Sequence, residues 1–484
     1  MKLYNKVLAD IEENTISLTT FDSRFTAGEL RDAVSKYEEL LRPYNVVGKR
    51  IAILVPAIQQ FLPLFFAINK LKGTVAPLSW QFRKEDLNNV IDFLNPHIIF
   101  TVNEHNGFSF SEVIQGWASE KGNETLIFTS ENCSDWHLTN FQGATKKLET
   151  IPGRFITFTS GSTGTPKGLI YKEEIMDYSY EQLSKVMKLD NKDNVFVYAS
   201  TSTVLGIISM SSVLMANANL LVANEFDLVK IIQRMEDTQC NKFITTPSIF
   251  KALYNFASKL NPKVLTNLEV VCLVGEKIPD NYVNPFPLLE QCIFVSHYGS
   301  SETGAVGNVY LKKDSKDLEY TLINEAEAKS VEGELYVKTG AMFTEYFGNP
   351  TLTNEVFEDG WYKMGDLVEF LDDQVFKIIG RKKDIIKKSG QQVVSAEVEQ
   401  ILHRMEEVQS VAVIGAPHEV FGEQIVAFVV SENLTAADIR TYCLGKISSY
   451  KVPDKIIFLE ELPLNQGKVD KLKLRTHFAE QQLT

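Results

Sequence analysis

Short apolar runs rich in β-branched residues alternate with helical patterns over the first three hundred residues. These runs lie at 51–57, 97–102, 154–160, 194–200, 219–223, 242–247, 268–275 and 292–299. Between the first two, apolar residues recur every three or four positions from Phe61 to Leu71 and stop before Gly73, which predicts a helix packed on a sheet. Strands alternating with helices in this way are typical of βαβ units, so the sequence predicts largely parallel sheets.

The pattern changes after about residue 305. From there to about 380 the apolar runs are short and separated by turn residues, which predicts a small antiparallel β region. A basic stretch between glycines follows at 380–390, and after it the runs at 411–417, 424–430 and 455–461 predict strands of a compact mixed segment. We therefore expect a domain boundary at the basic stretch.

Composition and charge limit the function classes. The chain has 484 residues, of which 44% are apolar, so it can bury a large core and is not disordered. Its 62 acidic and 49 basic residues give a net charge of −13, which opposes non-specific binding to nucleic acid or anionic membranes. A polyanionic substrate would therefore need a metal ion or a few well-placed cations.

Neither a disulfide framework nor a membrane span is expected. The five cysteines lie far apart without a CxxC pair, which also argues against a zinc site. The densest apolar stretch, 61–68, is far shorter than the roughly 20 residues of a membrane helix. The first residues lack the apolar core of a signal peptide. We expect a cytoplasmic protein with no nucleic-acid partner.

The strongest chemical signal is the segment FTSGSTGTPKG, Phe158 to Gly168, which follows a predicted strand. Its three glycines let backbone N–H groups approach phosphate oxygens, its five hydroxyl side chains add donors, and Lys167 adds a positive charge. A flexible solvent loop is the alternative, but such loops do not usually sit at a strand end. The spacing does not fit the Walker pattern. The segment predicts a phosphate-binding loop.

This loop and six shorter motifs in the same order resemble the adenylate-forming superfamily of acyl-CoA synthetases, luciferases and adenylation domains. The shorter motifs are GTVAPL (73–78), VGEKI (274–278), SHYGSSETG (296–304), GWYKMGDL (360–367), GRKKDIIKKSGQQVVSAEVE (380–399) and LPLNQGKVDK (462–471). The resemblance covers nearly the whole chain and is nearest to acyl-CoA synthetases. It implies an α/β fold with a large N-terminal domain of βαβ-type subdomains plus a small β region, followed by a small mobile α+β C-terminal domain. The ranges are 1–379 for the ATP- and acyl-binding domain, 380–383 for the hinge with Lys383 at its pivot, and 384–484 for the lid domain.

The resemblance also implies roles for single residues. Lys167, Glu302 and Lys468 would be catalytic, and Glu302 and Thr163 would bind Mg²⁺. Tyr298 would contact adenine and Asp366 the ribose hydroxyls, with Arg381 nearby. The full set of implied nucleotide-binding residues is Thr159, Ser160, Gly161, Ser162, Thr163, Gly164, Thr165, Gly275, Tyr298, Gly299, Asp366 and Arg381. By themselves, these residue types would also suit a core tyrosine, a solvated glutamate, a turn aspartate and a solvated lysine.

The segment 199–210 bears on the substrate. Aligned on Gly206, it places Thr203 where many acyl- and aryl-CoA ligases have His and amino-acid adenylation domains have Asp. Without that carboxylate, an α-ammonium would be buried unpaired at a cost of several kcal/mol, so amino-acid activation is disfavoured. We expect an apolar acyl pocket, although core packing explains the same apolar residues. Its expected residues are Thr203, Val204, Gly206, Ile207, Gly304 and Ala305.

The expected function is that of an AMP-forming acyl-CoA synthetase of fatty acid metabolism. A carboxylic acid and MgATP would give an acyl-adenylate and pyrophosphate, and the acyl group would then pass to the thiol of CoA. One alternative is a stand-alone adenylation enzyme that loads an acyl or aryl acid onto the pantetheine of a carrier protein. Another is a nucleotide-binding protein without catalysis, but Lys468, Glu302 and Asp366 are all present.

Overall fold

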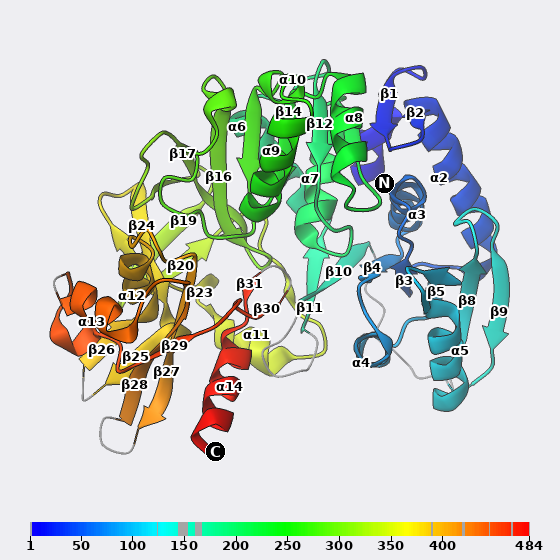
Figure 1. Cartoon of the computed structure of the whole chain (residues 1–484). Helices are drawn as coiled ribbons and strands as arrows, with labels where there is room; N and C mark the ends of the chain where they lie inside the picture. Colours follow the sequence, from blue (N-terminus) through cyan, green and yellow to red (C-terminus); the bar gives the residue numbers. More distant parts are fainter. Residues whose placement is uncertain are drawn as a thin grey trace. The chain divides into compact units, whose positions relative to one another are not determined.

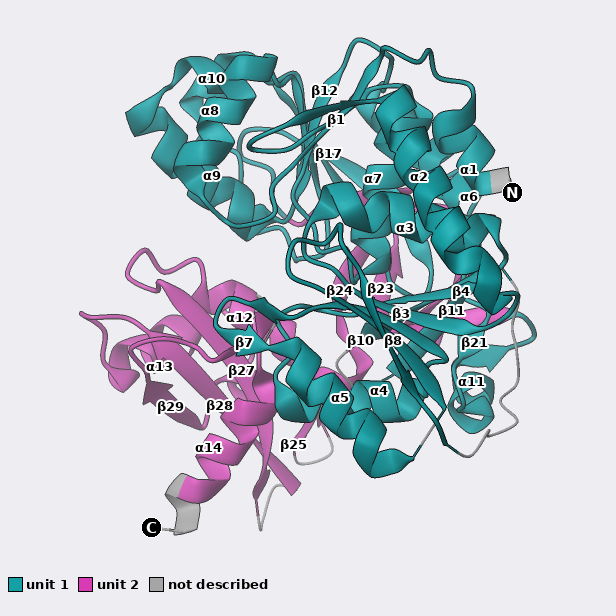
Figure 2. Ribbon diagram, turned by 90° about the vertical axis from the view of Figure 1, so that its right-hand side faces the viewer, with its two compact units in different colours: residues 1–316, 323–327, 338–360 teal, residues 317–322, 328–337, 361–484 magenta. Residues whose placement is uncertain are grey.

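The computed structural model describes residues 2–122, 124–143, 153–159, 167–388, 391–418, 422–444, 446–465 and 468–483. The chain divides into two compact units (Figure 2). Unit 1 comprises residues 1–316, 323–327 and 338–360, and unit 2 comprises residues 317–322, 328–337 and 361–484. Each unit is described by itself.

Unit 1 contains two groups of strands (Figure 1). The first sheet has the order β21-β11-β10-β4-β3-β5-β8-β9. Its strands are β3 (Arg50–Leu54), β4 (Thr74–Pro77), β5 (Ile98–Val102), β8 (Thr125–Ser130), β9 (His137–Phe141), β10 (Arg154–Thr159), β11 (Lys167–Lys172) and β21 (Glu345–Tyr346). The pairs from β10 to β8 are parallel, and α3 (Ile58–Lys70), α4 (Lys84–Leu94) and α5 (Phe110–Lys121) connect them. Every residue of β3 and β5 is buried, which explains why these strands are almost entirely apolar.

The second group of strands in unit 1 follows the order β17-β16-β15-β14-β12-β13-β1-β2. Its strands are β1 (Ile16–Thr19), β2 (Arg24–Thr26), β12 (Asn194–Val197), β13 (Asn219–Val222), β14 (Lys242–Thr245), β15 (Val270–Leu273), β16 (Ile293–Ser300) and β17 (Gly304–Leu311). The strands from β16 to β1 pair in parallel, whereas β16 and β17 form an antiparallel hairpin. The accompanying helices are α2 (Ala27–Leu41), α6 (Ile175–Met187), α7 (Val204–Met215), α8 (Leu228–Thr238) and α9 (Pro247–Leu260). The predicted parallel strands are thus confirmed.

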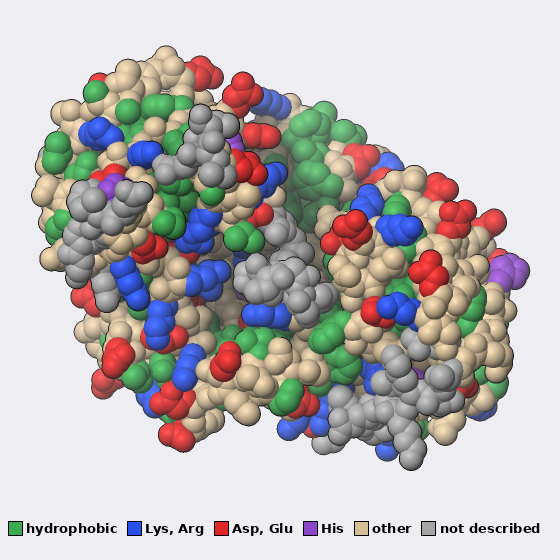
Figure 3. All heavy atoms as spheres, turned by 90° about the horizontal axis from the view of Figure 1, so that it is seen from below, with side chains coloured by type: hydrophobic (Ala, Val, Ile, Leu, Met, Phe, Trp, Pro, Cys, Tyr) green, Lys and Arg blue, Asp and Glu red, His purple; other side chains and the backbone are tan. Residues whose placement is uncertain are grey.

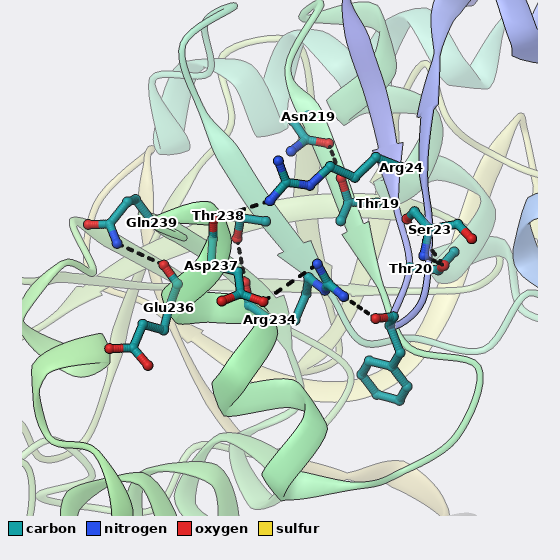
Figure 4. Close-up of polar contacts among 11 residues, drawn as sticks. Thr19, Thr20, Ser23, Arg24, Asn219, Arg234, Glu236, Asp237, Thr238 and Gln239 are labelled. Atoms are coloured by element: carbon teal, nitrogen blue, oxygen red, sulfur yellow. Dashed lines mark hydrogen bonds and ion pairs between the residues drawn. The ribbon is translucent and has the colours of Figure 1, made fainter.

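Polar contacts attach the N-terminal hairpin β1–β2 to a segment about 200 residues away (Figure 4). The Thr19 hydroxyl donates to Asn219 Oδ1 at 3.0 Å. The Arg24 guanidinium donates to the carbonyl of Asp237 in α8 at 3.3 Å. Arg234 of α8 donates to the carbonyl of Phe21 between β1 and β2, and it forms an ion pair with the Asp237 carboxylate at 3.7 Å within the helix. Together with the pairing of β1 with β13, these contacts hold the hairpin against β13 and α8.

Unit 2 begins with antiparallel strands, as expected for the segment before residue 380. They are β18 (Glu319–Leu322), β20 (Glu334–Lys338), β23 (Trp361–Phe370) and β24 (Val375–Arg381), in which β23 pairs with both β20 and β24. A separate sheet of unit 2 contains β25 (Ile385–Lys388), β26 (Gln391–Val394), β27 (Ser410–His418), β28 (Gly422–Val430) and β29 (Lys455–Phe458). The three strands predicted after the basic stretch are therefore confirmed.

Alternate residues of β27 and β28 face two separate cores. Val411 and Val413 belong to one core, together with residues of α12 (Ser395–Leu402) and α13 (Ala436–Leu444). Ala412 and Ile414 belong to the other, together with Leu474 of α14 (Lys471–Leu483). This period-two alternation fixes α14 on one face of the sheet. A short hairpin, β30 (Leu464–Asn465) and β31 (Lys468–Val469), precedes α14.

Within the described residues, no helix has the length and apolarity to cross a membrane. All five cysteines are free. Burial raises the pKa of the Cys240 and Cys272 thiols to about 12, so these groups remain protonated and unreactive. On the face drawn in Figure 3, acidic side chains lie among the basic ones.

Candidate active site

The predicted phosphate-binding loop joins two paired strands of the first sheet. Ser160, Gly161, Ser162, Thr163, Gly164 and Thr165 lie outside the described residues. Thr159 ends β10 and pairs with Lys167, which begins β11. The two ends of the loop are therefore held at adjacent positions, and Lys167 has a defined place on a strand.

A tyrosine lies between two residues of the predicted catalytic set. The Lys167 ammonium lies 5.7 Å from the centroid of the Tyr346 ring, and the Tyr346 hydroxyl donates to Glu302 Oε1 at 3.1 Å. The pairing of β11 with β21, which sets Leu169 opposite Tyr346, fixes this position. Nothing in the sequence around Tyr346 marks it as a site residue, because no local motif indicates a contact between strands about 175 residues apart. The structure thus brings Lys167 and Glu302 to the same tyrosine.

The turn that carries Glu302 is tied to its surroundings by the backbone. The fully buried Tyr171 hydroxyl donates to the Ser301 carbonyl at 3.0 Å, and burial raises the pKa of Tyr171 well above its usual value. The Phe343 amide donates to the Glu302 carbonyl at 2.9 Å. Thr303 is fully buried, and its hydroxyl accepts from the Ser300 amide at 3.1 Å. The Glu302 carboxylate therefore stands on a turn with little freedom to move.

The hairpin β16–β17 places Tyr298, Gly299, Gly304 and Ala305 beside this turn. Tyr298 is half-buried and pairs with Gly307, and Gly299 pairs with Ala305. A Cβ atom at Gly299 would lie 1.9 Å from the Gly304 carbonyl oxygen. Gly304 has a φ of 65°, and a Cβ there would lie 2.5 Å from Ala341 Cβ. These close approaches require glycine at both positions.

Thr203 caps the helix that contains the predicted acyl-pocket residues. Its hydroxyl accepts from the Gly206 amide at 3.1 Å and donates to the Ser200 carbonyl at 2.8 Å, as an N-cap residue does. A Cβ at Gly206 would lie 2.0 Å from the Ser200 carbonyl oxygen, so the turn before α7 requires this glycine. Val204 and Ile207 are both buried.

The residue of α7 that meets the predicted nucleotide motif is Leu205. It is half-buried, and its Cδ2 lies 3.7 Å from the position that a Cβ would take at Gly275. Gly275 follows β15 with a φ of 83°, which favours glycine. The start of α7 and the end of β15 are therefore neighbours, as a pocket formed from both segments requires.

In unit 2, Asp366 and Arg381 are in direct contact. The register of β23 and β24 pairs them, and Arg381 Nε lies 2.5 Å from Asp366 Oδ1. The Asp366 side chain is 3% exposed, whereas that of Arg381 is 51% exposed. Lys383 is exposed in the short turn 382–384, and Lys468 is exposed on β31. The structure joins Asp366 to Arg381 and places Lys383 and Lys468 on other segments of the same unit.

The donor set suits a magnesium ion that shares nucleotide phosphates. Within the parts of the chain that the structure describes, no group of three or more His, Cys, Asp or Glu could hold a metal ion. Mg²⁺ commonly binds through one or two carboxylates together with substrate phosphates, rather than in a cage made by the protein alone. Glu302, on its fixed turn, fits such a site, and Thr163 lies outside the described residues.

Family models match both parts of the chain. Residues 9–347 match the model described as AMP-binding enzyme, and residues 397–468 match that of the AMP-binding enzyme C-terminal domain. The chain therefore belongs to the AMP-binding enzyme family, which confirms the resemblance seen in the motifs. It is an AMP-forming ligase.

Similar proteins span nearly the same length. The long-chain-fatty-acid–CoA ligase FadD13 of Mycobacterium tuberculosis is 22% identical over 480 residues, covering 95% of this chain and 94% of that protein. The fatty acid–[acyl-carrier-protein] ligase ScoC of Streptomyces coeruleorubidus is 22% identical over 490 residues, covering 91% of each. The crystal structure of ATP-bound MatB from Rhodopseudomonas palustris superposes with a TM-score of 0.85 at 21% identity, covering 98% of each chain. This superposition confirms the predicted α/β fold with a large N-terminal and a small C-terminal part.

Proposed function

We propose that this protein is an AMP-forming acyl-CoA synthetase. It activates a carboxylic acid with MgATP and then transfers the acyl group to the thiol of CoA. The observation that carries the proposal is the group Lys167, Tyr346 and Glu302 at the base of the phosphate-loop hairpin. The identity shared with FadD13, a fatty-acid–CoA ligase, supports an acyl substrate.

In the first step, a carboxylate oxygen attacks the α-phosphorus of ATP, and the bond to the bridging oxygen breaks. Pyrophosphate leaves, and the acyl-adenylate remains. Lys167 holds the phosphates from the strand end, while the Lys468 ammonium stabilises the charge that builds up on the phosphoryl and bridging oxygens. A magnesium ion held by Glu302 and Thr163 would supply further neutralisation of the phosphates.

We assign the nucleoside contacts to single residues. Tyr298 offers an aromatic face to the adenine ring, next to Gly299, which leaves room for it. Asp366 accepts hydrogen bonds from the ribose hydroxyls, and Arg381 orients its carboxylate through the 2.5 Å contact. The Thr203 segment and Leu205 form the acyl side of the pocket.

In the second step, the C-terminal domain, residues 384–484, turns about Lys383 in the hinge at 380–383. Lys468 is withdrawn, and the CoA thiolate attacks the carbonyl carbon of the acyl-adenylate. The bond from this carbon to the phosphate oxygen breaks, and AMP leaves. Domain rotation lets one site serve two transition states in turn. We also propose a cytoplasmic location and a role in fatty acid metabolism, with no nucleic-acid partner.

The proposal is tested by acid-dependent release of pyrophosphate across a panel of fatty, aryl and small acids, with and without CoA. One class of acid should give a rate well above the others, and CoA should be consumed in equal amount. If no acid raises the rate of pyrophosphate release above the acid-free rate, the proposal is wrong.

The Lys468→Ala variant tests whether Lys468 acts in adenylate formation only. Because Lys468 acts only on the phosphoryl transfer, the variant should lose acid-dependent adenylate formation by a factor of about 10² to 10³. Thioester formation from supplied acyl-adenylate and CoA should stay within about threefold of the wild-type rate. Equal loss of both half-reactions would reject the role of Lys468.

A second candidate is an adenylation enzyme that loads a carrier protein. The similarity to ScoC, a fatty acid–[acyl-carrier-protein] ligase, favours it. Both acceptors present a pantetheine thiol, so the same assay with CoA and with a phosphopantetheinylated carrier protein separates the two candidates.

A further inference from the structure

An ion cluster connects the segment next to Lys383 with the helix that follows Lys468. Lys471 is the first residue of α14, and its Nζ lies 2.8 Å from Glu399 Oε1 and 3.6 Å from Asp384 Oδ2. One turn further along, Arg475 approaches Asp384 Oδ1 at 3.8 Å. We call Asp384, Glu399, Lys471 and Arg475 the Asp384–Lys471 cluster. All its members belong to unit 2.

Three of the four members of the cluster are shielded from solvent, whereas the Arg475 side chain is 40% exposed. The side chains of Asp384, Glu399 and Lys471 are 14%, 16% and 21% exposed. Glu399 Oε1 also accepts from the Val413 amide at 2.8 Å, and Lys471 donates to the buried Ser395 hydroxyl at 3.0 Å. Exposed ion pairs are weak because water screens them, whereas these groups have fixed partners on α12 and β27. Without the ammonium, two shielded carboxylates would repel each other.

The turn that carries Lys468 is fixed to the same helix. Only Val469 and Asp470 separate Lys468 from Lys471. The Asp470 carboxylate caps α14 by accepting from the amides of residues 472 and 473, at 3.1 and 3.0 Å. The Asp470 amide donates to the Pro463 carbonyl at 2.8 Å, which closes the hairpin. The position of the Lys468 backbone therefore follows the start of α14.

We propose that the Asp384–Lys471 cluster is a positioning device that makes the turn after Lys383 and the Lys468 hairpin one rigid body. The proposal rests on the function proposed above. When the chain rotates at Lys383, Lys468 then moves with the turn after Lys383 and keeps its position relative to it. Displacement of a reacting group by about 1 Å can cost a factor of 10², so the first half-reaction depends on this rigidity. The second half-reaction does not use Lys468 and does not depend on it.

The test compares Lys471→Met with Lys473→Met in the full-length protein. Lys473 is exposed on the same helix and serves as the matched control. With the best acid from the panel, Lys471→Met should lower the single-turnover rate of pyrophosphate release about 10- to 100-fold. The KM for ATP and the rate of thioester formation from supplied acyl-adenylate should change less than about threefold. Lys471→Arg should recover most of the rate.

A second variant guards against misfolding. Asp384→Asn removes the negative charge that pairs with Lys471 and keeps the size of the side chain. If the two residues act through the same contact, the double variant Asp384→Asn with Lys471→Met should lose no more activity than Lys471→Met alone. Equal loss in both half-reactions, or additive losses in the double variant, would overturn the proposal.

Hydrogen exchange tests the mechanical connection without substrate. In Lys471→Met and in Asp384→Asn, exchange should become faster both in residues 463–473 and in residues 380–388, and Lys473→Met should match the wild type. Unchanged exchange in either segment would refute the connection. Failure of the wild type to release pyrophosphate would instead reject the proposed function, so the two failures are distinguishable.

Discussion

Replacing Asp366 by Asn should affect the binding of ATP much more than the stability of the fold. The change removes the charge and keeps the shape of a side chain that is 3% exposed. Two contributions are lost. The ion pair with Arg381 is worth about 1 kcal/mol, because the Arg381 side chain is 51% exposed and water screens it. The proposed hydrogen bonds, which the ribose hydroxyls donate to the carboxylate, would be worth about 1.5 to 3 kcal/mol, and only when ATP is bound.

These energies predict different effects on two measurements. A loss of about 1.5 to 3 kcal/mol raises the KM for ATP roughly 10- to 150-fold. The loss of about 1 kcal/mol lowers the melting temperature of the free protein by about 1 to 3 °C. We would measure acid-dependent pyrophosphate release at varied ATP, together with thermal unfolding in the absence of nucleotide.

Glu334 provides a matched control within the same unit. Its side chain is 6% exposed, and its Oε2 lies 2.5 Å from Nζ of the exposed Lys382. Glu334→Gln should therefore lower the melting temperature by a similar amount and leave the KM for ATP unchanged. The assignment of Asp366 would be refuted if Asp366→Asn left this KM within twofold of wild type, or if Glu334→Gln raised it equally.

Three further predictions concern other positions. Tyr346→Phe removes the hydrogen bond to Glu302 but keeps the ring, so pyrophosphate release should fall about 10-fold at limiting Mg²⁺ and recover at high Mg²⁺; a fall that is independent of Mg²⁺ would contradict the positioning of Glu302. Thr203→Asp keeps an N-cap residue and adds a partner for an ammonium, so amino-acid substrates should gain activity in pyrophosphate release, and no gain would count against the assignment of that segment. Burial and the nearby Arg50 charge lower the pKa of His97 to about 4, and its Nδ1 accepts from the Arg50 amide at 3.1 Å. Neutral His97 thus stabilises the fold above about pH 6.5, and this contribution is lost as the pH falls toward 4. Urea unfolding at pH 7.5 and pH 5 should show about 1 to 2 kcal/mol more loss in the wild type than in His97→Asn, the lower value allowing for screening of this half-buried ring by water, and equal losses would refute the role of His97.

The buried strands were predictable because their signal is local. A parallel strand covered on both faces is mostly apolar, as β3 and β5 are apart from Arg50 and Thr101, and such a run stands out in the sequence. The helix expected from Phe61 also forms, but it begins earlier, at Ile58, and contains Pro63. The hairpin β1–β2 was not predicted, since its strands are short and its sheet partner β13 lies about 200 residues away.

The candidate site was likewise predictable where its signal is local in the sequence, and not where it depends on contacts between distant segments. The glycines, hydroxyl side chains and lysine of one loop indicate a phosphate-binding loop by composition alone. The order of the motifs along the chain indicates the family. The contact of Tyr346 with Glu302 and that of Lys471 with Asp384 depend on strand register and helix packing between distant segments. No pattern within either segment points to the other, so these contacts emerge only from the fold.

Transfer of oxygen from the acid to AMP tests the central claim most directly. The enzyme would react a carboxylic acid labelled with ¹⁸O in both carboxyl oxygens with ATP and CoA. Mass spectrometry would then give the ¹⁸O content of AMP and pyrophosphate. If the carboxylate attacks the α-phosphorus, each AMP carries one ¹⁸O atom, and pyrophosphate carries none. Unlabelled AMP, or label in pyrophosphate or in released phosphate, would contradict the adenylate mechanism.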